Sequence, residues 1–296
     1  MYKAGFRTRV FWAGAITALV LSGCSGSSSD ETRSMSLEFQ TLEPLGDDFD
    51  YEGWLIVDGA PISTGKFDVD ANSVPTPATF EVNEEDAESA TKFVLTIEPV
   101  ENDPAGPSDT KILAGDIAQG ATPTATLSIA DAAALGDDFT TAAGGFILAT
   151  PSTAATDADN NLGIWFLDPT AGPASTLTLP TLPAGWVYEG WVVGADGPVT
   201  TGRFTDVAAA DSDGAGPTAG PDGTPPFPGQ DFINPAVDLT SSHTAVLTIE
   251  PEPDNAAGPF TMKPLVQAIG TDTAPTVQIM GNNAAATNPT GSVVIR

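Results

Sequence analysis

The feature that most constrains the fold of this chain is a long motif that occurs twice. Residues 51–54 read Tyr-Glu-Gly-Trp, and residues 188–191 read the same. Each copy continues through a Gly-x-Phe to a Leu-Thr-Ile-Glu-Pro phrase, at 95–99 and at 247–251, and then to an Ala-Gly-Pro. Because the two copies agree in order as well as in composition, the sequence predicts two related structural units.

The segments around these motifs favour strands over helices. Apolar and polar residues alternate in several short runs, and turn formers such as Asp58-Gly59 separate them. Alternation bounded by turn residues is typical of half-buried strands. We therefore expect an all-β fold of two β-sandwich-like repeats, with a helical turn possible only at 131–139. The alternating runs are 36–40, 93–97, 124–129 and 275–280, and 145–150 with 163–167 are expected to form a hairpin.

The two copies differ mainly in the length of one loop. The segment between the Gly-x-Phe and the Glu-Pro is longer in the second copy, and the extra residues fall within 206–237, which is rich in Pro and Gly. Such a loop is expected at the surface, where an insertion costs little free energy. It is interpreted either as a mobile decoration or as a functional loop. Any partner is expected to meet the loops of this second unit.

The N-terminus has the pattern of an export signal. Basic residues lie within 1–9, and residues 10–21 form an apolar run that is too short to span a bilayer comfortably. The run ends in Leu-Ser-Gly before Cys24, which resembles the bacterial lipobox. The resemblance implies cleavage before Cys24 and acylation of this residue. Because Cys24 is the only cysteine, it cannot form an internal disulfide, and lipidation explains its presence.

The residues after Cys24 predict a tether and a location. Residues 25–34 are mostly small and polar, as in a flexible linker. Ser25 stands where an inner-membrane retention signal would have Asp, so the outer membrane or the cell surface is favoured over the inner membrane. The predicted division is a signal peptide at 1–23, the lipidated cysteine and tether at 24–35, the first β repeat at 36–130, a junction at 131–142, and the second β repeat at 143–296.

The charge of the chain limits its partners. It carries 39 acidic residues against 10 basic ones, a formal net charge of −29. A body of this charge repels nucleic acid and anionic lipid surfaces, so no nucleic-acid partner is expected. The acidity suits either a salt-rich habitat, where ions screen the self-repulsion, or a generally acidic secreted protein.

The second copy resembles a known family. Residues 182–193 read Leu-Pro-Ala-Gly-Trp-Val-Tyr-Glu-Gly-Trp-Val-Val, and Gly202-x-Phe204, a Thr-Ile-Glu-Pro at 248–251 and Gly258-Pro259 follow in order. This pattern is similar to the extracytoplasmic domain of RskA-type anti-sigma-K factors, and the first copy matches it more loosely. The resemblance implies a β-sandwich. The sequence shows neither a sigma-binding helical segment nor a membrane-spanning helix, so we do not expect the inhibition of a sigma factor to carry over.

Few residues could support catalysis. His243 is the only histidine, and Ser241 or Ser242 could join it in a triad, but the sister copy has Thr91 at the same place. We therefore expect His243 to be a surface strand residue. Paired carboxylates could hydrolyse a glycan, whereas repeated glutamates can equally be structural partners of Lys66 or Arg203. The repeated residues are Glu52, Glu98, Glu189 and Glu250, together with Trp54 and Trp191, which we expect in the core rather than as sugar platforms.

Two acidic segments are similar to calcium loops. Residues 157–161 read Asp-Ala-Asp-Asn-Asn, with oxygen-bearing side chains at alternate positions and Asp168 at the twelfth, and residues 211–214 read Asp-Ser-Asp-Gly. Hard oxygen ligands at alternate positions suit calcium. The first segment has Leu162 where such a loop has glycine, and ordinary Asp/Asn turns explain both. Calcium binding stays open, and no residue is assigned to a metal or a cofactor.

These patterns together predict a non-catalytic, lipid-anchored protein of the bacterial cell envelope that acts as a binding or structural module. Its expected contacts are the membrane, through acylated Cys24, and a protein or glycan of the envelope. The first alternative is an extracytoplasmic sensing domain related to the ectodomains of anti-sigma factors. The second alternative is an enzyme that acts on glycans.

The lipid anchor leads to the first testable prediction. Cys24→Ala removes the thiol that acylation requires, so the variant should be released from membranes or accumulate as a precursor. Metabolic labelling with palmitate measures this directly. Equal incorporation of label into the variant and the wild type would contradict the assignment.

Overall fold

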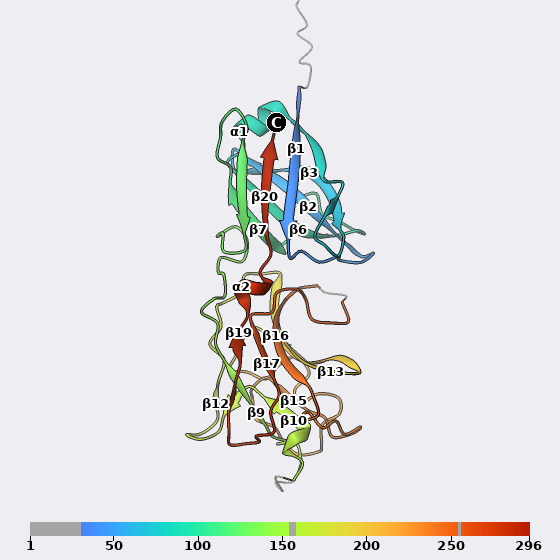
Figure 1. Cartoon of the computed structure of the whole chain (residues 1–296), viewed down its shortest axis with the longest axis vertical. Helices are drawn as coiled ribbons and strands as arrows, with labels where there is room; N and C mark the ends of the chain where they lie inside the picture. Colours follow the sequence, from blue (N-terminus) through green and yellow to red (C-terminus); the bar gives the residue numbers. More distant parts are fainter. Residues whose placement is uncertain (1–30, 154–157, 254–255) are drawn as a thin grey trace, which may run out of the picture.

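The computed structural model describes residues 31–153, 158–253 and 256–296. Two units, whose regular secondary structure is almost entirely β-strand, are stacked along the long axis of the molecule (Figure 1). The expected all-β fold is confirmed. None of the helices in these residues has the length and the apolar run needed to cross a bilayer.

The first unit contains a nine-stranded sheet with the order β4-β3-β2-β6-β7-β8-β20-β1-β5. The short helix α1 (Glu84–Ser89) follows β5 and begins at Asn83, whose side chain accepts hydrogen bonds from the amides of Glu85 and Asp86. The strands are β1 (Thr32–Gln40), β2 (Phe49–Val57), β3 (Ala60–Val69), β4 (Pro75–Thr76), β5 (Thr79–Asn83), β6 (Lys92–Pro99), β7 (Lys111–Asp116), β8 (Thr124–Ser128) and β20 (Thr290–Ile295).

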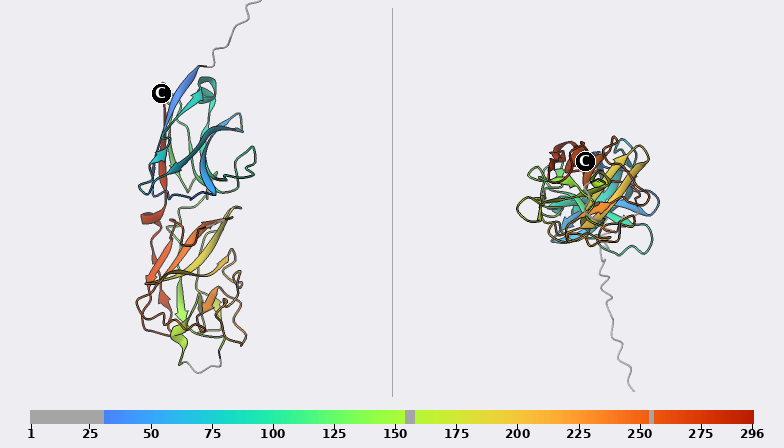
Figure 2. Two further views of the ribbon diagram at one scale, coloured as in Figure 1. Left: turned by 90° about the vertical axis from the view of Figure 1, so that its right-hand side faces the viewer. Right: turned by 90° about the horizontal axis from the view of Figure 1, so that it is seen from below.

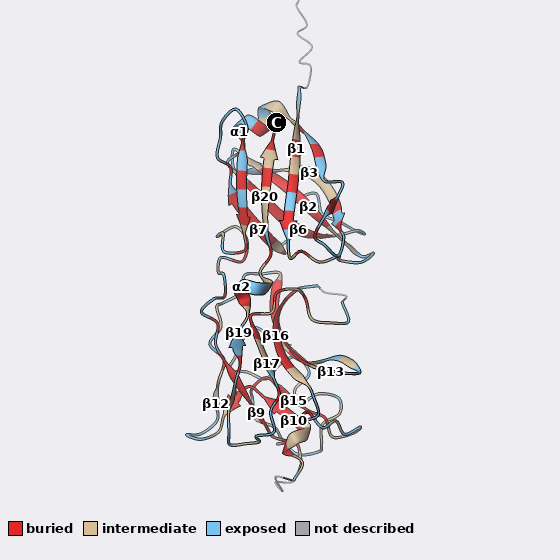
Figure 3. Cartoon of the chain, viewed as in Figure 1, coloured by how far each residue is buried: buried red, intermediate tan, exposed pale blue. Residues whose placement is uncertain are grey.

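This sheet folds over on itself at the contact between β7 and β8. These two strands pair through Ala114 and Ser128 alone, and a Cβ atom added to Gly115 would lie 2.1 Å from the carbonyl oxygen of Thr126. The close approach of the two strands requires glycine at this position. Buried and exposed residues alternate along β1 and β20 (Figure 3), so one face of this part of the sheet packs on the core.

The second unit has a five-stranded sheet, β14-β13-β16-β17-β19, a four-stranded sheet, β15-β10-β9-β18, and a two-stranded ribbon, β11-β12. Its strands are β9 (Gly145–Leu148), β10 (Gly163–Trp165), β11 (Leu167–Asp168), β12 (Ala174–Ser175), β13 (Trp186–Gly194), β14 (Gly197–Phe204), β15 (Gly229–Asp231), β16 (Thr244–Pro251), β17 (Leu265–Ala268), β18 (Gln278–Ile279) and β19 (Gly281–Asn282). The 3-10 helix η1 (Asn160–Leu162) precedes β10. The expected hairpin is present as the antiparallel pair β9 and β10.

The repeated motifs occupy the same register in both units. In each, the tyrosine and tryptophan of Tyr-Glu-Gly-Trp face the Glu-Pro strand across an antiparallel ladder. The tyrosine ring stacks on the phenylalanine of the Gly-x-Phe with a centroid distance of 5.9 Å in both units. The matched pairs are Tyr51–Ile97 with Tyr188–Ile249, Trp54–Val94 with Trp191–Val246, and Tyr51–Phe67 with Tyr188–Phe204.

The tryptophan and the phenylalanine of each motif are 13 residues apart in both units, at 54 and 67 and at 191 and 204, and a glycine in each hairpin explains this constancy. The register shifts beside the tryptophan in both units, and the facing strand carries Gly65 at φ 115° or Gly202 at φ 101°. Left-handed φ values of this kind favour glycine, and a bulge increases the local twist. The equal spacing from the tryptophan to the phenylalanine in the two copies therefore corresponds to a bulged hairpin.

The far end of the chain does not belong to the second unit. Strand β20 pairs with β1 over Met35–Gln40 and with β8 over Thr124–Ser128. The range 143–296 expected for the second repeat therefore differs from the spatial unit. Below, the first unit means residues 31–130 with 290–296, and the second unit means 143–282. The chain leaves the first unit through a first connector (131–142) and returns through a second connector (283–289), which contains the short helix α2 (Ala284–Thr287).

The connectors and the facing loops pack the two units against each other. Asn288 Nδ2 in the second connector donates to the carbonyl oxygen of Asp138 in the first, at 2.7 Å. Thr261 Oγ1 donates to the carbonyl oxygen of Thr41 at 3.1 Å across the interface. One cluster of buried apolar side chains runs through both units. The helical turn considered for 131–139 consists of hydrogen-bonded turns, with the ring of Phe139 edge-on to Tyr188.

The segment 206–237 is only partly the surface loop that its composition predicted, because residues 206–226 are exposed or half-buried whereas residues 227–232 are buried. It contains β15, all of whose residues are buried, and the side chain of Phe227 packs into an apolar cluster with Trp165. The amide of Gly220 donates to Ser152 Oγ at 2.8 Å. The loop is therefore folded onto the sheet that it extends, and its Pro and Gly residues form its turns.

The repeated tryptophans give a prediction about stability. Trp54 and Trp191 are each only 4% exposed. Truncating a buried tryptophan to alanine costs about 3–5 kcal/mol, so Trp54→Ala and Trp191→Ala should each lower the free energy of unfolding by about that amount. Denaturant titration measures the loss, and Val199→Ala at an exposed position serves as the control. Losses near zero for both tryptophan variants would contradict their place in the core.

Candidate functional site

The repeated tryptophans are hydrogen-bonded inside the protein. Trp54 Nε1 donates to Thr96 Oγ1 and Trp191 Nε1 to Thr248 Oγ1, both at 2.9 Å. The rings are buried, so neither offers an open face for stacking against a sugar. The tryptophans belong to the core.

The repeated glutamates are also structural. Glu52 accepts a hydrogen bond from Ser63, and Glu189 forms an ion pair with Arg203 at 2.8 Å, as expected for this pair. Lys66 does not pair with Glu52 but with Asp103, at 3.1 Å.

The glutamates of the two Glu-Pro phrases have one shared role. Glu98 Oε1 accepts from the amide of Ser108 at 2.8 Å, and Glu250 Oε1 accepts from the amide of Phe260 at 2.9 Å. Both side chains are fully buried, and burial raises the pKa of Glu98. Each carboxylate therefore fixes the loop that follows its strand.

The structure does not assemble a triad at His243. Its ring lies against the backbone of Gly194, because a Cβ atom added there would be 2.5 Å from the ring. Its Nδ1 atom is buried and has no hydrogen-bond partner in the part of the chain that the structure describes. His243 is half-buried rather than a freely exposed surface residue.

The second unit contains a buried aspartate, Asp231, that the sequence analysis missed. Asp231 is fully buried and accepts hydrogen bonds from Trp165 Nε1 at 2.7 Å and from the amide and hydroxyl of Ser152, at 2.9 and 2.5 Å. Burial raises its pKa, while these donors oppose the rise. The three residues are far apart in the sequence, so no local pattern could have grouped them. Since donors surround the carboxylate, it ties loops together rather than acting as a base.

The acidic segments form turns. Asp168 Oδ1 accepts from the amide of Thr170 at 2.8 Å, and Asp159 accepts from Thr150 and Thr153. Asp157 lies outside the described residues. Within 31–153, 158–253 and 256–296, no three Asp, Glu, His or Cys side chains gather as a metal site would require.

Cys24, the one predicted site residue with an assigned chemistry, also lies outside the described residues. Its acylation stays a prediction. The candidate site that the structure itself offers is a groove in the first unit, which no sequence motif marked.

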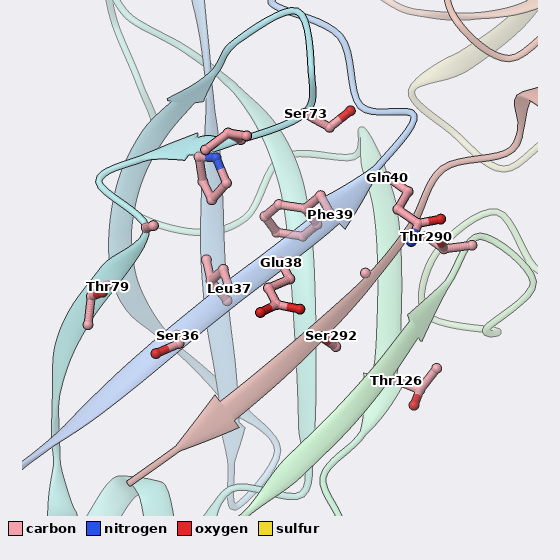
Figure 4. Close-up of a pocket in the computed structure, with 14 residues that line it drawn as sticks. Ser36, Leu37, Glu38, Phe39, Gln40, Ser73, Thr79, Thr126, Thr290 and Ser292 are labelled. Carbon is pink, nitrogen blue, oxygen red and sulfur yellow. The ribbon is translucent and has the colours of Figure 1, made fainter.

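The groove has a volume of about 660 Å³ and lies where β1, β20 and β8 run side by side (Figure 4). Glu38 faces Ser292 across one ladder, and Ser292 faces Thr126 across the next. These side chains point away from the core, because their neighbours Leu37 and Val293 are the buried ones. The lining residues are Ser36–Gln40, Ser73–Pro75, Ala78, Thr79, Thr126 and Thr290–Ser292.

The groove includes an open edge of β1. Strand β1 pairs with β20 as far as Gln40 but with β5 only as far as Ser36, which faces Thr79. The amide of Leu37 still donates to the carbonyl oxygen of Ala78 at 3.2 Å. Beyond this point β1 has no strand partner on this side among the described residues, and residues 73–75 and Ala78 form the rim of the groove, where β4 pairs with β3 and not with β1.

The groove combines apolar and polar groups, because Leu37, Phe39, Val74 and Pro75 line it beside hydroxyls and one carboxylate. Ser and Thr hydroxyls provide donors and acceptors, and Glu38 is the only charged side chain among its lining residues, all of which the structure describes. Glu38 is exposed. The polar groups that the groove presents are therefore hydroxyls, the amide of Gln40 and a single carboxylate.

A family model supports the resemblance noted from the sequence. Residues 22–112 match the model described as anti-sigma-K factor RskA, C-terminal. The match covers the first copy, whereas the motifs that suggested the family were clearest in the second. No curated protein and no solved structure matches the chain. The first unit is thus similar in sequence to this anti-sigma factor domain.

The acidic turn at 211–214 gives a prediction about pH. Burial raises the pKa of Asp211 to about 7, and neighbouring Asp213 adds to the rise. In the unfolded chain an aspartate titrates near 3.9. The stability that protonated Asp211 contributes is therefore full below about pH 4 and is lost as the pH rises through about 7.

Asp211→Asn cannot ionise and should remove this loss. The free energy of unfolding of the variant, relative to the wild type, should rise between pH 4 and pH 8. Denaturant titrations across this range test it, with exposed Asp272→Asn as the control. A difference that stays constant with pH would show that Asp211 has an ordinary environment.

Proposed function

We propose that this protein is a non-catalytic, lipid-anchored module of the bacterial cell envelope that binds an extended polypeptide segment in the groove of the first unit. The observation that carries the proposal is the open edge of β1, which ends in a groove lined by hydroxyls and Glu38. An extended segment can add to such an edge through main-chain hydrogen bonds, while the groove selects its side chains.

Charge indicates the kind of segment. Glu38 lies in the groove of a chain with a net charge of −29, so a basic or polar segment is attracted and an acidic one is repelled. The sequence alone had directed attention to loop 206–237. Because that loop folds onto its own sheet, the groove is the better candidate.

The position of the two ends of the described chain suits an anchored protein. The described chain begins at β1 and ends at β20, which run antiparallel, so both ends lie at the same pole of the first unit (Figure 1). An anchor at Cys24 would hold this pole near the membrane and point the second unit away (Figure 2). As before, Ser25 favours the outer membrane or the cell surface over the inner membrane.

A second candidate function is extracytoplasmic sensing. The match of residues 22–112 to the anti-sigma-K factor domain favours it. In that case the segment bound in the groove would be a signal, and loss of the protein would change transcription. Comparing transcripts with and without the protein, with Glu38→Lys as a third strain, distinguishes sensing from simple binding.

The binding proposal predicts the effect of reversing one charge. Glu38→Lys places a cation in the groove and should reduce retention of the partner from envelope extracts by about tenfold, the effect of about 1.4 kcal/mol. Glu88→Lys makes the same charge change on exposed α1 and should leave retention unchanged. The retained partner should dissociate as salt rises, since exposed charges are screened.

Two outcomes would count against the proposal. Equal retention by the Glu38→Lys and Glu88→Lys variants would remove the groove from it. Hydrolysis of an envelope glycan by the purified protein, abolished by Glu98→Gln or Glu250→Gln, would replace it with an enzymatic function.

A further inference from the structure

The two units share one strand order. Each unit also contains one strand that follows the other unit's repeat in the chain. Apart from the two-residue edge strand β4, which has no counterpart in the second unit, the first unit reads β3-β2-β6-β7-β8-β20-β1-β5. The second reads β14-β13-β16-β17-β19 in one sheet and β18-β9-β10-β15 in the other. Strands β18 and β19 are consecutive in the chain and together take the place of β8, because β19 pairs with β17 and β18 with β9.

This correspondence gives β9 and β20 equivalent places. Strand β20 lies between β8 and β1, and β9 lies between β18 and β10. Yet β9 follows the first repeat in the chain, and β20 follows the second. Each unit is therefore completed by the strand that follows the other repeat.

The sequence before and within these strands supports the equivalence. The first connector opens with Asp-Ala-Ala-Ala at 131–134, and the second opens with Asn-Ala-Ala-Ala at 283–286. Strand β9 is preceded by glycine and reads Gly-Phe-Ile-Leu, while β20 contains Gly-Ser-Val-Val-Ile at 291–295. Two copies of one connector and one strand thus cross over between the units.

In two copies of the chain the first units are identical. A strand such as β20 therefore makes the same contacts in the first unit of either copy. The choice between partners then depends on the connector and on concentration, because a tether raises the effective concentration of its own strand. Within one chain this exchange is already complete. The slot between β1 and β8 recognises the sequence of β20 and not the chain that carries it.

We propose that this slot also accepts β20 from a second copy of the chain, which gives a reciprocal strand-exchanged homodimer beside the closed monomer. The partner is a second copy because the contacts are those of β20 itself. Val293 and Ile295 are buried, and Gly291 is required where an added Cβ would lie 2.6 Å from the ring of Phe39. In the dimer, the Thr290 and Ser292 side chains of each groove come from the other protomer.

The test places one cysteine on each side of the slot in different chains. Glu38 and Ser292 face each other on the outer face of the sheet. A disulfide between Glu38→Cys in one chain and Ser292→Cys in another therefore forms at this position only if β20 has inserted into the first unit of the other chain. Both are full-length chains in which Cys24→Ser removes the natural thiol. They are unfolded, mixed, refolded together at a low and at about 100-fold higher concentration, and oxidised.

The expected result is a covalent dimer whose yield rises with concentration, several-fold above a control pair of Glu38→Cys with Thr170→Cys, which is exposed in the second unit. A single chain with both Glu38→Cys and Ser292→Cys should cross-link as a monomer. If that chain cross-links while the mixed pair never exceeds its control, exchange between copies is refuted. Failure of the single chain to cross-link would refute the pairing of β1 with β20 on which the proposal depends.

Discussion

The insertion of β20 between β1 and β8 is the interaction on which the rest of this structure depends. It joins the last strand of the chain to the first, so the sheet of the first unit cannot close until the whole second unit has been traversed. The connectors must then run in opposite directions between the units, which is why they lie together and are linked by hydrogen bonds such as Asn288 to Asp138. Contacts of such long sequence separation are slow to form and are lost together.

Within each unit, the repeated polar residues satisfy buried groups. Tyr51 Oη donates to the carbonyl oxygen of Glu43 at 2.9 Å, and Tyr188 Oη to that of Pro180 at 2.7 Å, eight residues upstream in both cases. A buried polar group without a partner costs free energy, so each hydroxyl, indole and carboxylate of the motif needs its matched acceptor or donor. This need explains why the motif recurs so fully, and it accounts for the repeated glutamates without catalysis.

The surface that is left after these structural roles includes the groove of the first unit. The similarity to the anti-sigma-K factor domain lies on residues 22–112, which contribute β1 and the rim of the groove, while β20 comes from the far end of the chain. The groove is thus built from both ends of the sequence. Its hydroxyls and one carboxylate suit recognition better than reaction, which is why we place binding at the centre of the proposal.

The sequence by itself determined the strand content, the two-fold repetition, the hairpin of 145–150 with 163–167 and the buried tryptophans, because these depend on local periodicity and on residues close together in the chain. It also indicated the export signal and Cys24, which remain predictions. It could not locate the groove, because Glu38, Ser292 and Thr126 meet only through the register of β1, β20 and β8. It likewise missed the contact of Asp231 with Trp165 and Ser152, which are far apart in the sequence. It did not predict the buried part of 206–237, because a loop rich in Pro and Gly looks exposed whether or not the side chain of Phe227 packs in an apolar cluster. Only the tertiary structure decided that β20 belongs to the first unit, since the sequence places it at the end of the second repeat and long-range pairing with β1 and β8 makes the choice.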